Sequence, residues 1–100
     1  MTKRSEAHER LLDEIAEEKA AALHRIASRL EGLLAELASL REELEVGPGE
    51  RRAALLSRFN AAQERARLYR WFLEVQREAI GLLRHEGLDD FYRVPAPIRD

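Results

Sequence analysis

The chain of 100 residues contains no cysteine, so disulfide bonds, thiolate metal ligands and a cysteine nucleophile are all excluded. Helix-breaking residues are few, with five glycines and three prolines, and aromatic residues make up only 6%. No apolar run approaches the roughly 18 residues of a membrane span. The basic residues Lys3 and Arg4 are not followed by an apolar segment, so we expect no secretory signal. These absences predict a cytoplasmic protein with no membrane span.

What the chain does contain is charge, at 36% of residues, together with leucine, alanine, arginine and glutamate in abundance. This composition is typical of long helices and coiled coils. The net charge of −2 gives no overall signature of nucleic-acid binding. Residues 1–46 carry 7 basic and 11 acidic side chains, whereas residues 47–100 carry 10 basic and 8 acidic ones. The two halves therefore differ in sign, at −4 and +2.

Two heptad repeats flank a single break at Gly47-Pro48-Gly49. The first stripe consists of Leu12, Ala16, Lys19, Leu23, Ile26, Leu30, Leu33, Leu37, Leu40 and Leu44. The second consists of Leu55, Phe59, Ala62, Ala66, Tyr69, Leu73, Gln76, Ile80 and Leu83. Steps of four and three residues give the 3.5-residue period of a helix-pairing seam. Gly47 can end the first helix and Pro48 cannot continue it.

The pattern predicts an all-α fold, a long antiparallel helical hairpin with helices at about 5–46 and 50–86. Gly87 is the expected stop of the second helix. Short connections favour antiparallel neighbours, and partners across the seam should have residue numbers that sum to about 95–96. Leu37 then lies beside Phe59, Leu12 beside Leu83, and Glu43 faces Arg51. We expect residues 1–87 to form the hairpin domain and 88–100 an extended tail.

A second apolar stripe remains outside this seam. It comprises Leu68, Phe72, Val75, Ala79 and Leu82 with Trp71 at its edge, and Leu11 and Ile15 on the matching side of the first helix. An apolar face of this size has to be covered. A second copy of the chain would cover it in a homodimeric four-helix bundle, which we expect. The alternative is a monomer whose own tail folds back.

The C-terminal tail has a different composition. Residues 93–99 contain two prolines separated by one residue, so this segment is extended rather than helical. The large apolar residues of the whole tail are Phe91, Tyr92, Val94 and Ile98. They predict either packing against the second stripe or docking on another protein, because extended proline segments bind with little loss of entropy.

Residues associated with catalysis or metal binding are sparse. His8, His24 and His85 have none of the spacings of a metal site. No glycine-rich phosphate loop follows a strand. Lys19 and Gln76 interrupt the seam, and we interpret them as a polar layer that fixes the register; a small anion site is the other reading. We expect no enzyme, no cofactor and no metal.

Six arginines stand against one acid, Glu64, between residues 51 and 72. They are Arg51, Arg52, Arg58, Arg65, Arg67 and Arg70. A basic helical face with aromatic residues can bind phosphates or an acidic partner, while the plainer reading is a solvated face. The sequence therefore predicts a non-enzymatic protein–protein interaction or assembly module that self-associates and presents its tail. Nucleic-acid or acidic-partner binding through the arginines is the alternative.

Overall fold

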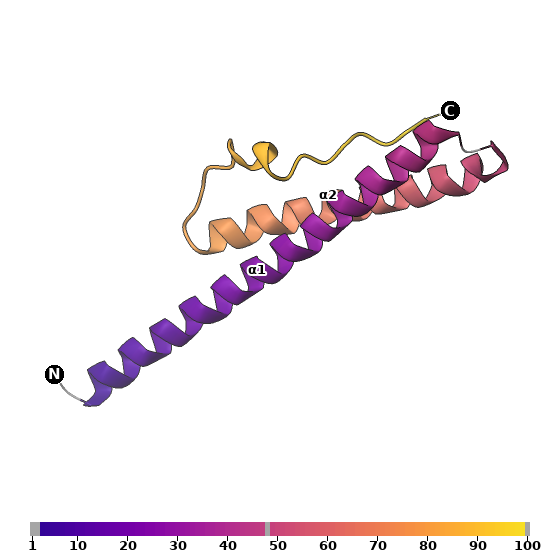
Figure 1. The fold of residues 1–100 in the computed structure, drawn as a ribbon. Helices are drawn as coiled ribbons and strands as arrows, with labels where there is room; N and C mark the ends of the chain where they lie inside the picture. The colour runs from indigo at the N-terminus through magenta and orange to yellow at the C-terminus, as the bar shows by residue number, and fades with distance from the viewer. Residues whose placement is uncertain (1–2, 48, 100) are drawn as a thin grey trace.

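The computed structural model describes residues 3–47 and 49–99. Within them the chain forms an antiparallel hairpin of two helices, α1 (Lys3–Val46) and α2 (Arg52–Ala79) (Figure 1). Two short 3-10 turns, η1 (Gly49–Arg51) and η2 (Leu88–Asp90), precede and follow α2. The all-α hairpin expected from the heptad pattern is confirmed. The molecule is elongated, with extents of 71 × 22 × 15 Å.

The core is the predicted seam, but only over the part of it nearest the loop. Leu30, Leu33, Leu37, Leu40 and Leu44 of α1 are buried against Leu55, Phe59, Ala62, Ala66 and Leu73 of α2. Leucines of α1 face alanines of α2 in the middle of the seam, so large and small side chains interdigitate. Arg41 lies over the ring of Phe59, with its guanidinium carbon 5.4 Å from the ring centre. This contact shields the core near the loop from water.

The loop end agrees with the sequence. Gly47 has a φ of +123° and Gly49 a φ of +50°, conformations that glycine adopts readily and other residues rarely do. Pro48, expected to stop the first helix, lies outside the described residues. The expected pairing of Arg51 with Glu43 is confirmed, with 3.8 Å between Nη2 and Oε1.

Helix α2 ends seven residues earlier than predicted, at Ala79 rather than near residue 86. The cause is Gly81, which has a φ of +89°. The Gly81 N–H donates to the Glu78 carbonyl at 3.0 Å, and the Leu82 N–H donates to the Arg77 carbonyl at 2.9 Å. These two bonds form a Schellman motif, in which a left-handed glycine turns the chain out of the helix.

The early stop leaves α1 longer than its partner, so its N-terminal part projects beyond α2 (Figure 1). Lys19 marks the boundary, because its Nζ donates to the Ala79 carbonyl at 3.3 Å. The charge of Lys19 there suits the negative end of the α2 dipole. We call Lys3–Glu18 the overhang. The expected pairing of Leu12 with Leu83 is wrong, since both side chains are exposed.

After α2 the chain turns back, and residues 92–98 run along the hairpin toward its loop end (Figure 1). The turn η2 is fixed by Leu88, whose side chain is buried in the core. Tyr92, Val94 and Ile98 pack against the same core. The extended tail is thus a third element of the fold, lying against both helices.

Candidate interaction surfaces

The first surface is the apolar stripe on α2, which we call the outer stripe. Its members on α2 are Leu68, Trp71, Phe72, Val75 and Ala79, and Leu82, which the sequence placed on the same stripe, lies beyond the end of the helix. All are exposed except Phe72, which is half-buried. The centre of the Phe72 ring lies 5.5 Å from the ring centres of both Tyr69 and Trp71, so the three aromatic side chains pack against one another along the helix.

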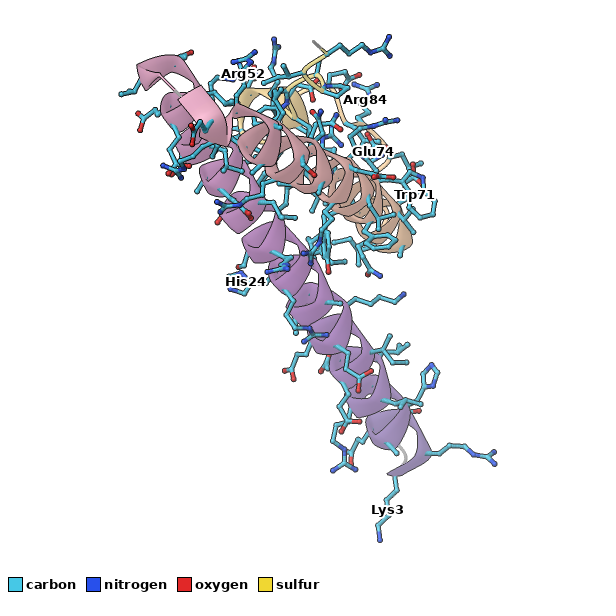
Figure 2. The ribbon with its side chains drawn as sticks, turned by 90° about the vertical axis from the view of Figure 1, so that its right-hand side faces the viewer. Lys3, His24, Arg52, Trp71, Glu74 and Arg84 are labelled. Atoms are coloured by element: carbon cyan, nitrogen blue, oxygen red, sulfur yellow. The ribbon has the colours of Figure 1, made fainter. Side chains whose placement is uncertain are left out.

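A groove of about 560 Å³ lies on this side of α2, lined by Glu64, Arg65, Arg67, Leu68 and Trp71. Trp71 is 57% exposed and projects from α2 into open space (Figure 2). A large aromatic side chain beside arginines, on an apolar stripe, is the kind of residue that anchors protein interfaces. The outer stripe therefore has the composition of a docking surface.

The overhang is the second surface. Leu11 is 52% exposed, and Leu12 and Ile15 are also exposed. Ile15 precedes the buried Leu33 by five full helical turns, so both project from nearly the same side of α1. The apolar face of α1 thus continues past the end of α2 with no second helix opposite it (Figure 2).

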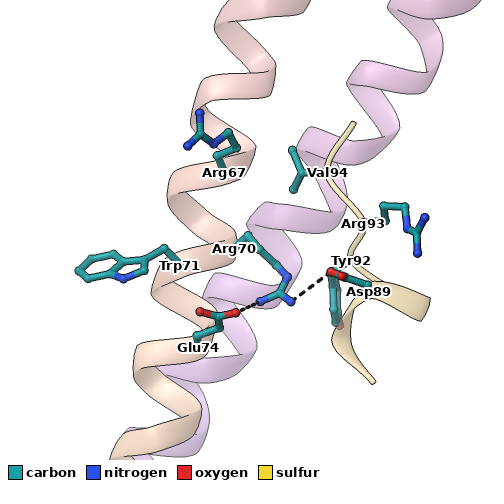
Figure 3. A pocket seen from close by; sticks show the side chains of 8 residues that line it. All are labelled: Arg67, Arg70, Trp71, Glu74, Asp89, Tyr92, Arg93 and Val94. Atoms are coloured by element: carbon teal, nitrogen blue, oxygen red, sulfur yellow. Dashed lines mark hydrogen bonds and ion pairs between the residues drawn. The ribbon is translucent and has the colours of Figure 1, made fainter. Parts of the chain in front are cut away.

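The predicted basic face is divided rather than continuous. Arg51 pairs with Glu43. Arg70 binds the Glu74 carboxylate at 2.7 Å and the Asp89 carboxylate at 3.2 Å (Figure 3). The Arg70 side chain is only 15% exposed, and its Nε is buried without a hydrogen-bond partner among the described residues.

The remaining arginines of this face, Arg52, Arg58, Arg65 and Arg67, are exposed. Arg67 also borders a second open groove, of about 610 Å³, between α2 and the tail. Trp71 lines this groove as well, and Figure 3 shows its indole directed away from the tail. Arg67 therefore lies at the border of the two grooves, and Arg65 lines the one beside the outer stripe.

The tail lies on the other flank of the hairpin. Tyr92, Val94 and Ile98 are half-buried there, whereas Phe91 is 78% exposed. The tail does pack on its own helices, as one reading of the sequence expected. The expectation that it covers the outer stripe is wrong, because that stripe remains exposed.

Sequence reasoning missed the two side chains that hold the tail, Asn60 and Gln63. Asn60 Nδ2 donates to the Ile98 carbonyl at 2.9 Å, and the Ile98 N–H donates to Asn60 Oδ1 at 2.8 Å. Gln63 is 5% exposed, and its Nε2 donates to the Pro95 carbonyl at 3.1 Å. The sequence does place these two amides, three residues apart, on the same flank beside the apolar seam, but it gives no sign that the tail buries them and supplies the partners that buried amides need.

Tyr92 ties the tail to α1. Its hydroxyl donates to Oε1 of Glu31 at 3.2 Å. Burial raises the pKa of the Tyr92 hydroxyl above 10.0, and the hydrogen bond and negative charge of Glu31 raise it further. The neutral, donating form of Tyr92 is the one that the docked tail favours.

Titratable clusters with metal-binding composition are absent from the described residues. His24 projects from α1 on the side away from α2 (Figure 2). His85 lies beyond the end of α2, and its Nε2 is hydrogen-bonded to Oε1 of Glu78 at 3.1 Å. Across the described residues, neither helix is long and apolar enough to cross a membrane. No known family model, curated protein or solved structure matches this chain.

Proposed function

We propose that this chain is a non-enzymatic assembly module that self-associates, with the overhang of one copy packing on the outer stripe of another. The observation that carries the proposal is the position of the exposed apolar side chains. Leu11, Leu12 and Ile15 lie on the overhang, and Leu68, Trp71 and Val75 lie on α2. Apolar stripes exposed on two helices are the usual faces of bundle interfaces.

The charges of the overhang and of the outer stripe favour contact between these two surfaces of different copies. The overhang holds six acidic and three basic side chains, whereas the exposed Arg65 and Arg67 beside the outer stripe stand against one acid, Glu64. Two overhangs side by side would repel each other. An overhang on the outer stripe of a partner instead brings acids near Arg65 and Arg67, an arrangement that favours encounter and sets orientation.

The dimensions are also compatible. The sixteen residues of the overhang span about 24 Å, and the helical part of the outer stripe spans about 17 Å between the Cα atoms of Leu68 and Ala79. A two-fold axis would make the contact twice, since each copy contributes one overhang and one stripe. Both unpartnered faces would then be buried in a single assembly of the four-helix type.

Absolute mass by light scattering across about a hundredfold dilution tests the proposal. We expect a dimer that dissociates on dilution, and Leu11→Asp to raise its Kd at least about 100-fold, because the substitution falls in both copies and each leucine side chain contributes about 1.5–3 kcal/mol when buried. Leu11 is exposed, so the substitution should leave the helix content of the monomer unchanged.

Ala20→Asp is the matched control. It adds the same charge to α1 at an exposed position half a turn around the helix from Leu11, and should leave the Kd within about threefold. A monomer at every concentration would show that self-association is wrong. The arginine face would then be the surface to test, by titrating DNA and RNA at two salt concentrations, since phosphate binding weakens steeply with salt.

A further inference from the structure

The groove that holds the tail recognises main-chain atoms. Asn60 and Gln63 form three hydrogen bonds with the peptide groups of Ile98 and Pro95, at 2.8–3.1 Å, two of them as donors and one as an acceptor. Asn60 both donates and accepts, as a neighbouring β-strand would. Because every extended peptide carries these groups, the polar part of this recognition does not require the side chains of the tail itself.

The apolar part of the groove is filled incompletely. An open hollow of about 210 Å³ remains between the tail and α1, lined by Leu34, Leu37, Ala38 and Arg41 with Arg93 and Pro95. The side chains of Val94 and Ile98 are only half-buried. A segment with bulkier residues beside Pro95 would bury more surface in the same place than the tail does.

Departure of the tail would not require α2 to unfold, because the connection before the tail is held separately, with Arg77 Nη2 donating to the Arg84 carbonyl at 2.8 Å and Leu88 buried. The eight residues 80–87 join α2 to η2 and contain no helix or strand. Departure of the tail would uncover Leu34 and Leu37 and leave the buried amide of Gln63 without Pro95. The open state is therefore unfavourable unless another extended segment takes the same place.

We propose that this groove is a peptide-binding site for an extended, proline-containing segment of another protein, and that the tail is its built-in competitor. The partner segment carries aliphatic residues at the positions of Val94 and Ile98 and a residue other than proline at the latter, where Asn60 needs an N–H. The site differs from the self-association surface, since the tail packs on the buried core whereas the outer stripe is exposed, and Trp71 stands at the border between the two.

The test uses the full chain with Val94→Asp and Ile98→Asp, which disengage the tail and keep the groove. The probe is a fluorescent peptide of residues 90–99, followed by anisotropy. We expect the variant to bind this peptide at least about tenfold more tightly than the wild type does, because a tethered competitor acts at an effective concentration in the millimolar range.

Two controls distinguish recognition of main-chain atoms from non-specific binding of the peptide. A peptide N-methylated at the Ile98 amide should bind about tenfold more weakly, and so should the parent peptide to a variant that also carries Asn60→Ala. Gln76→Ala changes another amide of α2, about 20 Å along the helix from Gln63, and should leave binding unchanged.

If the two aspartates reduce the helix content, the wild type is used with ¹⁵N labelling and excess peptide. The backbone amide signals of the labelled tail, those of Val94 and Ile98 among them, should then move to the positions of an unstructured chain as the tail is displaced, because the unlabelled peptide takes over its bonds to Asn60 and Gln63. Absence of binding to folded variant, or of any shift in the wild type, overturns the proposal, as does equal binding of the N-methylated peptide. Loss of a wild-type dimer in the aspartate variant would assign the groove to the tail of a second copy, and also overturn it.

Discussion

At the scale of single residues, Asn60 and Gln63 show where a heptad pattern stops being informative. The pattern identified Phe59, Ala62 and Ala66 as core, and these are buried. Residues beside a seam are normally solvated, so the two amides read as surface. Only the path of the tail, which no local pattern specifies, makes Gln63 a buried residue with a defined partner.

Tyr92 gives the tail a dependence on pH. Its raised pKa means that folding favours the neutral hydroxyl, so this contribution to stability is complete below pH 10.0 and is lost as the pH rises through the folded-state pKa. Tyr92→Phe should lower the free energy of unfolding by about 1 kcal/mol at pH 8. Unfolding in urea from pH 8 to 11.5 should show the difference between the two proteins shrinking above pH 10. A difference that stays constant to pH 11.5 would contradict this role.

At the scale of elements, the heptad pattern of the second helix continues past the residue at which the helix ends. Ile80 and Leu83 continue the heptad register, which is why the pattern predicted a helix to residue 86. Gly81 lies between them, and Leu82 supplies the apolar residue that commonly follows such a glycine. The side-chain pattern is satisfied by either conformation, and the Schellman hydrogen bonds decide between them.

The stop can be tested by comparing two glycines. A Cβ at Gly81 would meet nothing within 4 Å, but the φ of +89° disfavours any other residue. Gly81→Ala should therefore destabilise the fold by about 1 kcal/mol or more. Gly32, in the middle of α1, has the same free space and no such φ, so Gly32→Ala should stabilise by about 0.5–1 kcal/mol. Thermal unfolding measures both, and changes of the same sign would show that Gly81 is no special stop.

At the scale of the whole molecule, burial is concentrated at one end. The buried core residues of α1 lie between Leu30 and Leu44, whereas residues 3–21 are exposed throughout. The heptad pattern predicted one continuous seam because it extends over two predicted helices of similar length. The all-α hairpin could be predicted from the sequence, but the unequal lengths of the helices and the route of the tail could not.

This gradient predicts the pattern of amide hydrogen exchange. Under conditions that keep the protein monomeric, peptides covering residues 3–18 should exchange orders of magnitude faster than those covering 30–44, because local opening there disrupts no buried contacts. At concentrations where copies associate, protection should appear in residues 5–18 and 68–79. Mass spectrometry of the exchanged protein resolves both sets, and an overhang unprotected in a dimer would place the contact elsewhere.

The position of Trp71 has an optical consequence. It is the only tryptophan in the chain, and its indole is mostly in water on the surface that we assign to a partner. Its fluorescence should be red-shifted and readily quenched by iodide in the isolated protein, and should become blue-shifted and shielded when that surface is covered. The protein thus carries its own spectroscopic reporter at the site where occupancy matters, and no label need be attached there.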